Sequence, residues 1–169
     1  NMVAMTKTIN EFFGSGVVVP GWGIIMNDEM GDFVETPGSI NSVEPYKRPL
    51  SSMSPTLVLD SRGRSFMTIG TPGATRIFTT TAQIISDIID FGMPIQDAIM
   101  APRMYQNATS KLILEGTYPV GALAGVQKLG HQVTINPSWD LYFGGVQGVI
   151  YDYAKGLLYG GGDPRRDGH

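Results

Sequence analysis

The chain has 169 residues, a net charge of −3 and no cysteine. This length fits one domain, and a hydrophobic fraction of 42% is enough to build a sizeable core. The composition excludes disulfides, a thiol nucleophile and cysteine-bound zinc. Lysine and arginine form no stripe typical of a nucleic-acid partner, and the apolar stretches are too short to predict a membrane span.

The first part of the chain shows few long periodic patterns. Alternating apolar residues predict a strand at 2–9, and glycine-rich turns flank two short β runs at 17–19 and 24–26. Residues 27–42 have the composition of a loop. The sequence opens inside a strand-like pattern without an initiator methionine, so we expect a processed piece whose first residues lie upstream.

The remainder carries both helical and strand patterns. Apolar residues at helical spacing, closed by Gly92 and Gly130, predict helices at 75–91, 94–100 and 119–129. Strands are predicted at 56–59, 65–69, 112–115, 132–135, 145–151 and 157–160. Strands and helices come in runs rather than in strict strand–helix–strand units, which favours a layered α+β fold over a doubly wound sheet. No repeat or internal boundary is visible, so we predict a single domain over residues 1–169.

Two loops carry groups suited to an acyl compound that also bears a carboxylate. Residues 47–56 place four hydroxyl groups within six positions, directly before a predicted strand. Residues 70–76, Gly-Thr-Pro-Gly-Ala-Thr-Arg, place flexible backbone amides directly before a predicted helix. Adjacent hydroxyls suit a carboxylate, and adjacent backbone N–H groups suit an oxyanion.

Three acidic residues follow a short β run, at Asp28, Glu29 and Asp32. They are either a solvated loop or a recognition site for a cation such as an ammonium group. The only histidines are His131 and His169. A serine–histidine–aspartate triad could use only His131, and we do not favour it. No paired histidines or carboxylate cluster typical of a metal site is present, so we expect neither a metal nor a cofactor.

A glycine-rich run, Gly160-Gly161-Gly162-Asp163-Pro164, precedes Arg165 and Arg166 near the end of the chain. Glycine and proline at this density are typical of a turn, and arginine is rarely buried. We therefore predict a surface turn at these two arginines.

Together, these segments resemble the small subunit of gamma-glutamyltranspeptidase, an N-terminal nucleophile hydrolase. The resemblance spans nearly the whole chain and is densest at 1–33, 47–56, 70–77 and 161–166. Its most specific part is the run Pro-Leu-Ser-Ser-Met-Ser-Pro-Thr at 49–56.

The resemblance implies a four-layer αββα sandwich of the N-terminal nucleophile hydrolase type, completed by a large N-terminal subunit of the same precursor. The family precursor cuts itself in two, and the new N-terminal threonine of the small subunit is the nucleophile, with its own α-amino group as general base. Judged by the family pattern, that threonine would lie about ten residues before Asn1. Thr6 and Thr8 cannot replace it, because both are internal and have no free α-amine.

The resemblance also implies partners and a compartment. It implies a heterodimer with the large subunit, which can pair into a heterotetramer, and a gamma-glutamyl small molecule as substrate. A periplasmic or extracellular location is favoured by the resemblance, with a cytoplasmic one as the alternative.

Three residues match catalytic positions of the family. Thr8 matches a threonine that hydrogen-bonds the nucleophile, and Gly73 and Ala74 match the two consecutive oxyanion-hole residues. Family members commonly have Gly-Gly at the last two positions, and alanine keeps the N–H but loses easy access to positive φ. If this position requires positive φ, we expect its geometry to be strained.

Five further residues match positions that bind the amino-acid head of the substrate. Asn10 matches a residue at the α-amino and carboxylate end, Glu29 and Asp32 match the pair that binds the α-ammonium, and Ser51 and Ser52 match the pair that binds the α-carboxylate. Charge-assisted contacts are worth roughly 1.5–3 kcal/mol each, so the head group can set substrate choice.

The expected function is cleavage of gamma-glutamyl amides such as glutathione, by hydrolysis or transfer, through a gamma-glutamyl-threonine acyl-enzyme. The connection at 34–46 is too short for the lid that several family members carry, so we expect hydrolysis to outweigh transfer. The alternatives are a cephalosporin (glutaryl) acylase of the same superfamily and an inactive family member. Glu29 and Asp32 favour the first function, because a glutaryl group has no α-ammonium to bind.

Overall fold

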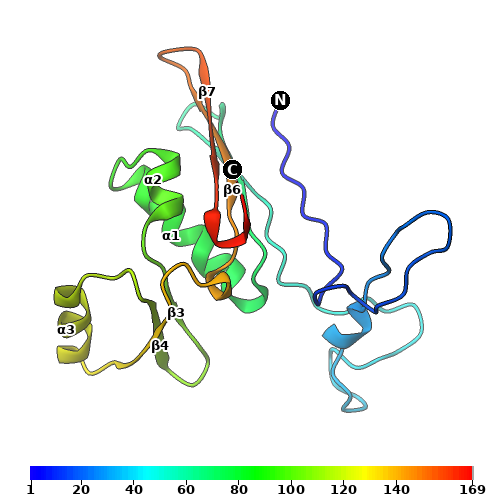
Figure 1. Ribbon diagram of the computed structural model, residues 1–169. Coiled ribbons are helices and arrows are strands. Elements are labelled where there is room, and N and C mark those ends of the chain that lie inside the picture. The colour runs from blue at the N-terminus through cyan, green and yellow to red at the C-terminus, as the bar shows by residue number, and fades with distance from the viewer. Residues whose placement is uncertain (169) are drawn as a thin grey trace. The chain divides into compact units, whose positions relative to one another are not determined.

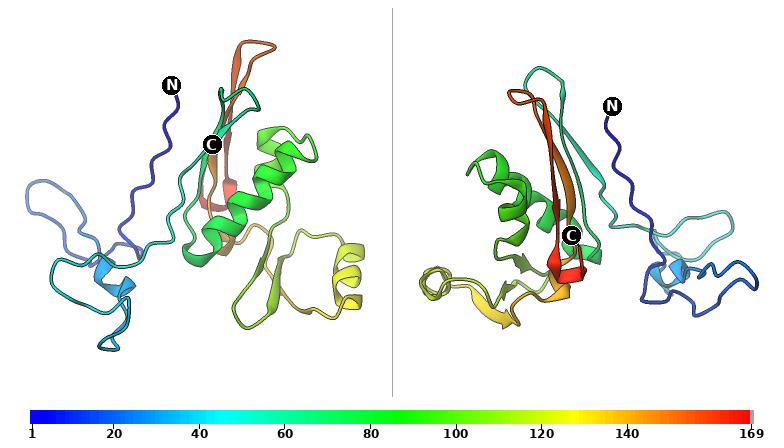
Figure 2. Two further views of the ribbon diagram at one scale, coloured as in Figure 1. Left: turned by 180° about the vertical axis from the view of Figure 1, so that it is seen from behind. Right: turned by 45° about the horizontal axis from the view of Figure 1, so that its top comes forward.

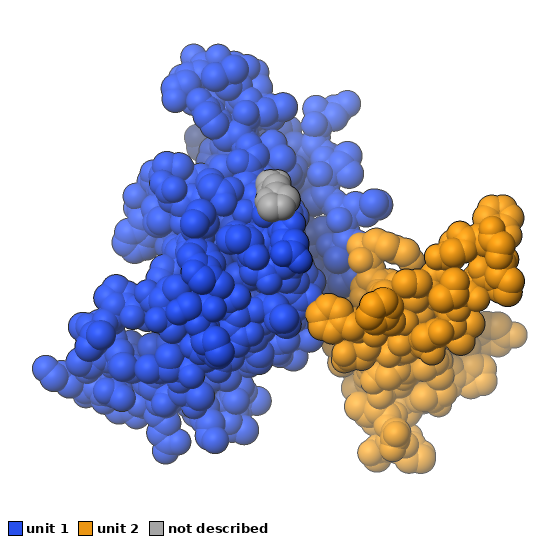
Figure 3. Space-filling model, viewed as in Figure 1, with its two compact units in different colours: residues 1–6, 53–169 blue, residues 7–52 orange. Residues whose placement is uncertain are grey.

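The computed structural model describes residues 1–168 and divides the chain into two compact units. Unit 1 consists of residues 1–6 and of the chain from residue 53 onward, and unit 2 consists of residues 7–52 (Figure 3). The two units differ in kind, because unit 1 contains all of the β-sheets and α-helices found in the described residues.

Unit 1 has the mixed helix and strand content of an α+β fold (Figure 1). Its strands are β1 (Thr56–Leu59), β2 (Ser65–Gly70), β3 (Met104–Gln106), β4 (Lys111–Glu115), β5 (Gln132–Asn136), β6 (Gln147–Asp152) and β7 (Leu157–Gly162). Its helices are α1 (Ile77–Ile89), α2 (Ile95–Met100), α3 (Val120–Lys128) and the short 3-10 helices η2 (Ala74–Arg76), η3 (Leu141–Phe143) and η4 (Pro164–Arg166).

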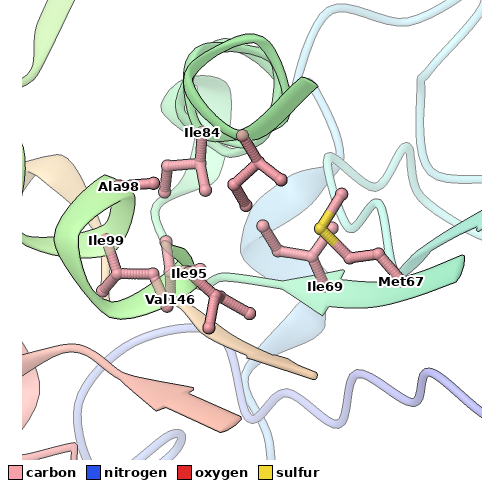
Figure 4. Close-up of a cluster of buried hydrophobic side chains, with 8 residues drawn as sticks. Met67, Ile69, Ile84, Ile95, Ala98, Ile99 and Val146 are labelled. Atoms are coloured by element: carbon pink, nitrogen blue, oxygen red, sulfur yellow. The ribbon is translucent and has the colours of Figure 1, made fainter. Parts of the chain in front are cut away.

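The larger sheet is antiparallel throughout, with the strand order β1-β2-β6-β7. Helices α1 and α2 pack against one of its faces (Figures 1 and 2). Buried side chains from β2, α1, α2 and the residue just before β6 interlock between the helices and the sheet (Figure 4). The cluster consists of Met67, Ile69, Ile84, Ile88, Ile95, Ala98, Ile99 and Val146. Each large side chain buried in this way contributes about 1.5–3 kcal/mol, so this layer is the main source of hydrophobic stability in unit 1.

The smaller sheet has the order β3-β4-β5. Strands β3 and β4 are antiparallel, whereas β4 and β5 are parallel and are connected through α3. A parallel pair needs such a crossover because the chain must return to the same end of the sheet. The two sheets and the helices confirm the prediction of an α+β sandwich fold.

Unit 2 has little regular structure. It contains the 3-10 helix η1 (Glu29–Asp32) and two isolated bridges, Val18 with Ile25 and Val34 with Ser42. Hydrogen bonds from side chains to backbone groups, such as those of Asp28 and Asn41, replace the ladder of a sheet. The predicted β runs at 17–19 and 24–26 are therefore reduced to a single bridge, while the predicted loop at 27–42 is correct apart from η1 and the second bridge.

Most predicted elements of unit 1 are confirmed, and their bounds shift by at most a few residues. The strand at 56–59 is correct as predicted, and the predicted helix at 75–91 begins as the 3-10 helix η2 and continues as α1. The three-residue strand β3 has too short a pattern to be recognised and was missed.

The predicted strand at 2–9 is wrong. Exposure alternates along residues 1–8 as in an extended segment, yet no strand is assigned there among residues 1–168. Period-2 alternation reports an extended backbone with two unlike faces, whereas a strand also requires a hydrogen-bonding neighbour. The pattern therefore predicted the conformation correctly and the pairing wrongly.

The predicted surface turn at the two arginines is wrong for Arg165, because only 6% of the whole residue is exposed. Its guanidinium pairs with Glu115 at 2.6 Å and with Asp163 at 3.2 Å, and Arg103 pairs with the same Asp163 at 2.7 Å. All four side chains are at most 2% exposed, so they form a buried network of two cations and two anions. Burial, together with the charge of Arg165, lowers the pKa of Arg103 to about 10.

Candidate functional site

The turn between β2 and α1 places two consecutive backbone amides at its tip. Gly73 has φ 140° and ψ 15°, a conformation that favours glycine, and Ala74 follows with φ 51°. A non-glycine residue in this left-handed region costs about 1–2 kcal/mol. Ala74 therefore has a positive φ, at a position where family members commonly have glycine. The expectation of a strained backbone at this alanine is confirmed.

Neither the Gly73 nor the Ala74 amide donates a hydrogen bond to another residue within 1–168. Backbone N–H groups without a protein acceptor, next to each other at the start of a helical segment, form a concentration of positive partial charge. Such a pair of donors suits the oxygen of a tetrahedral acyl intermediate. The turn therefore presents two adjacent backbone donors that have no protein acceptor within residues 1–168.

The acidic group of unit 2 is built on η1. Asp28 precedes this helix and organises the preceding chain, since its Oδ1 accepts the N–H of Glu11 at 3.1 Å and its own N–H donates to the carbonyl of Ile9 at 3.2 Å. Glu29 and Asp32 form the two ends of η1. The helix brings both carboxyl groups together, because residues three apart lie on the same side of a 3-10 turn.

Glu29 has the properties of an incomplete binding group. Its Oε1 atom is buried and has no hydrogen-bond partner in residues 1–168. Burial raises the pKa of Glu29 above its ordinary value, and the neighbouring charges of Asp32 and Asp28 raise the pKa further. The Thr8 hydroxyl hydrogen-bonds this carboxyl group and opposes the shift. A cation placed beside Glu29 would satisfy the free oxygen and relieve the repulsion between the carboxylates.

Asn10 lies against the same group. Its backbone N–H donates to the Thr8 hydroxyl at 2.8 Å, and its side-chain amide donates to the carbonyl of Asp28 at 3.4 Å. A Cβ atom at Gly31, in the middle of η1, would lie 3.5 Å from Asn10 Nδ2, which is ordinary contact, so this amide lies against the helix backbone. The structure therefore brings Thr8, Asn10, Glu29 and Asp32 together within unit 2, as one polar group.

The two predicted serines lie at the end of unit 2, with Ser51 exposed and Ser52 half-buried. The chain just before them is held by Asn41, which sequence reasoning missed. Asn41 donates through Nδ2 to the carbonyl of Asp32 at 2.7 Å and accepts the N–H of Leu50 at 2.9 Å. One side-chain amide thus connects the acidic helix to the serine segment. No sequence pattern marks it, because an asparagine in a loop is ordinary.

The described residues contain no group of three or more His, Asp or Glu side chains arranged to hold a metal ion. Within residues 1–168, no helix combines the length and apolar character needed to cross a bilayer. His131 is exposed after α3, and His169 lies outside the described residues.

The chain is similar to known proteins along nearly its whole length. The model of the gamma-glutamyltranspeptidase family matches residues 1–169. The glutathione hydrolase proenzyme of Bacillus subtilis is 36% identical over 168 residues, which cover 99% of this chain and 28% of that protein. An acylase proenzyme of a Pseudomonas species is also 36% identical over 168 residues, covering 99% of this chain and 29% of that protein. The chain thus spans less than a third of the length of these curated relatives.

Among solved structures, the chain is similar to an acivicin-inhibited gamma-glutamyltranspeptidase. The TM-score is 0.87 at 36% sequence identity, and the match covers 99% of this chain and 94% of that one. Because a family model and a solved structure both match along essentially the full chain, the chain belongs to the gamma-glutamyltranspeptidase family.

Proposed function

We propose that this chain is the catalytic small subunit of an enzyme that cleaves gamma-glutamyl amides such as glutathione, by hydrolysis or transfer. The acyl group is carried by an N-terminal threonine upstream of Asn1, whose α-amine serves as general base and whose hydroxyl is positioned by Thr8. Gly73 and Ala74 stabilise the oxyanion that forms when this hydroxyl attacks the gamma-carbonyl.

The observation that carries the proposal is the buried, unpartnered Oε1 of Glu29 beside Asp32. A cation beside two carboxylates that repel each other lowers their electrostatic energy, and the α-ammonium of a glutamyl group would supply that cation. Asn10 contributes an amide to the same end of the substrate, and the hydroxyls of Ser51 and Ser52 suit its α-carboxylate.

The experiment is kinetic and uses the full-length protein that contains this chain. We expect Asp32→Ala to lower kcat/KM for a gamma-glutamyl anilide by roughly 10- to 100-fold, the value of one charge-assisted contact. Glu35→Ala, which removes an exposed carboxylate three residues further along, is the matched control and should leave kcat/KM unchanged. A folded Asp32→Ala variant with the wild-type kcat/KM would refute the assignment.

A second candidate is a glutaryl acylase, because an acylase proenzyme is as similar in sequence as the glutathione hydrolase is. The two substrates differ at the carbon that carries the α-ammonium. Turnover of a glutaryl anilide against a gamma-glutamyl anilide therefore separates them, and the carboxylates Glu29 and Asp32 favour the gamma-glutamyl compound. A preference for the glutaryl anilide would support the acylase.

We further propose that the chain arises by self-cleavage of a precursor and pairs with the larger N-terminal fragment. The names of the relatives support this, since they are proenzymes. Purified protein should give two chains, and N-terminal sequencing of the smaller one should begin with threonine. A single uncleaved chain without turnover would instead indicate an inactive family member.

Hydrolysis should outweigh transfer. The segment at 34–46 folds back on itself, with the N–H of Val34 donating to the carbonyl of Asn41 at 2.9 Å, and this supports the view that it forms no lid. Water at roughly 55 M then competes with an acceptor amine for the acyl-enzyme. Free glutamate should exceed gamma-glutamyl dipeptide at low millimolar acceptor, and dominance of the dipeptide would show that another segment excludes water.

A further inference from the structure

We propose that Thr71 is a positioning residue that aims the Gly73 N–H at the oxyanion, by holding the peptide plane that Gly73 shares with Pro72. The inference rests on the proposed role of Gly73 and Ala74 as oxyanion donors. It adds the side chain of Thr71, to which the resemblance assigned no role, and on which the direction of the first donor depends.

The hydroxyl of Thr71 both donates and accepts a hydrogen bond. Thr71 is 4% exposed, and its Oγ1 donates to the carbonyl oxygen of Pro72 at 2.8 Å while accepting the N–H of Gly145 at 3.0 Å. A hydroxyl has one proton to donate, so the accepted bond leaves that proton for the Pro72 carbonyl. The hydroxyl is thereby fixed between two backbone groups of different segments.

The Pro72 carbonyl and the Gly73 N–H belong to the same rigid peptide unit. The peptide is trans, so the two groups point in opposite directions. A hydrogen bond that holds the carbonyl oxygen therefore also fixes the direction of the N–H. Gly73 with φ 140° needs such a restraint, because a glycine allows many rotations of the preceding peptide unit.

The second donor, the N–H of Ala74, is also oriented through the carbonyl of its own peptide unit, but by a backbone group instead of a side chain. The carbonyl of Gly73 accepts the N–H of Arg76 at 3.1 Å, and this bond orients the peptide unit that carries the Ala74 N–H. Both donors are thus aimed through the carbonyl on their own peptide unit. Only the Pro72–Gly73 unit depends on a side-chain hydroxyl, so only that donor can be tested by an ordinary substitution.

The loop behind Thr71 makes the arrangement stiff. A Cβ atom at Gly144 would clash with Thr71 Oγ1 and would lie 2.7 Å from the Pro72 carbonyl oxygen. The loop at residues 144–145 therefore packs directly against the hydrogen bond between Thr71 and Pro72. The loop is anchored on both sides, because Phe143 O accepts Arg103 Nη1 at 2.9 Å and the N–H of Val146 donates to Asp163 at 2.8 Å. Thr71 is therefore hydrogen-bonded to a loop tied to the buried ion network.

The kinetic test compares three variants of the full-length protein. Thr71→Val removes the hydroxyl at nearly constant volume, Thr71→Ser restores it, and Thr81→Val is the matched control. Thr81 is equally buried at 4% exposure, and its hydroxyl has no partner within residues 1–168. Complete loss of an oxyanion donor lowers kcat by roughly 100- to 1000-fold. We expect Thr71→Val to lower kcat for a gamma-glutamyl anilide by roughly 10- to 100-fold, because the N–H remains but is misaimed.

Separate measurement of kcat and KM distinguishes a loss of N–H orientation at Gly73 from a general structural effect. The oxyanion forms only in the transition state, so KM should stay within about twofold while kcat falls. Thr71→Ser should recover most of kcat, and Thr81→Val should keep it. Unchanged kcat in Thr71→Val, or an equal fall in Thr81→Val, would overturn the proposal. If Thr71→Val does not fold, Thr71→Ala replaces it.

A crystal structure of Thr71→Val gives a readout that is independent of the reaction. We expect the Pro72–Gly73 peptide to be rotated or to occupy two orientations, with the wild-type orientation retained in Thr71→Ser. A wild-type orientation in Thr71→Val overturns the proposal whatever the enzyme catalyses. A rotated peptide combined with no turnover by the wild-type protein would overturn the proposed function alone.

Discussion

At the residue scale, the most unusual residue of the turn between β2 and α1 is Ala74, an alanine with φ 51°. The cost of this conformation, about 1–2 kcal/mol, is borne by the folded protein because the Cβ atom crowds the backbone. Glycine would remove that cost but would add about 0.4–1 kcal/mol of conformational entropy to the unfolded chain. The two effects have opposite signs, and the strain is the larger.

We therefore predict that Ala74→Gly stabilises the protein by up to about 1 kcal/mol, measured as a rise in the denaturant midpoint at constant m-value. Ala122→Gly, on the exposed side of α3, is the control and should destabilise by about 1 kcal/mol, since its backbone is helical. A loss of stability in Ala74→Gly as large as in Ala122→Gly would contradict the strain argument.

Glu29 leads to a prediction about pH. Its pKa is raised by burial and by the charge of Asp32, so it takes up a proton at a higher pH than an ordinary glutamate. A protonated carboxyl carries no negative charge and therefore binds an ammonium group much more weakly. KM for a gamma-glutamyl anilide should therefore rise as the pH falls through the raised pKa of Glu29, and Glu29→Gln should abolish this rise.

The control for the pH prediction is a glutaryl anilide, which lacks the α-ammonium. Its KM should not follow the titration of Glu29. If both anilides show the same rise in KM at low pH, the titrating group acts on the reaction in general and not on recognition of the ammonium.

At the scale of elements, the candidate site combines a 3-10 helix with loops. Helix η1 carries the acidic pair, and Asn41 connects its end to the serine segment through bonds of 2.7 and 2.9 Å. Loops of this kind lack a ladder of backbone bonds, so single side chains determine their conformation. Asn41 is expected to matter more than its ordinary residue type suggests.

We predict that Asn41→Ala raises KM for the gamma-glutamyl anilide and lowers kcat/KM by roughly 10-fold, as two hydrogen bonds of about 1 kcal/mol each are lost. Asn107→Ala is the matched control, because Asn107 also organises a turn through its side chain, between β3 and β4. Similar kinetics for both variants would show that Asn41 does not position the site.

At the scale of the whole molecule, the buried ion network connects distant parts of unit 1. Arg165 joins η4 to the end of β4 through Glu115, and it also donates to the carbonyls of Ile99 and Ala101. Such a network is costly to form from solvated charges, but removing one member leaves another buried charge unpaired. It therefore constrains how these segments can pack.

We predict that Glu115→Gln destabilises the protein by about 3–5 kcal/mol, since the Arg165 guanidinium loses the closer of its two charged partners and two buried cations are left to share Asp163. Glu44→Gln, which breaks an exposed pair with Lys47, should cost at most about 1 kcal/mol. Chemical denaturation of both variants gives the comparison. Equal and small losses would show that water enters and solvates Arg165.

Much of the secondary structure of unit 1 was predictable because it depends on neighbours a few residues away. The alternation at 56–59, the apolar spacing of α1 and the glycines after α1 and α3 are local signals, and the structure confirms them. The family could also be assigned from short runs of residues such as 49–56, since the comparisons agree with that assignment. The roles given to all of the matched site residues remain predictions, namely those of Thr8, Asn10, Glu29, Asp32, Ser51, Ser52, Gly73 and Ala74.

The sequence by itself determined the local elements, the α+β class and the family, because these depend on periodic patterns and on the order of short motifs. Only the tertiary structure decided that Arg165 is buried, that residues 2–9 are extended without pairing, that Ala74 has positive φ and that Asn41 and Thr71 hold backbone groups. The physical reason is the same in each case. Burial, pairing and backbone strain depend on the wider fold, including partners such as Glu115, which lies fifty residues from Arg165 in the sequence.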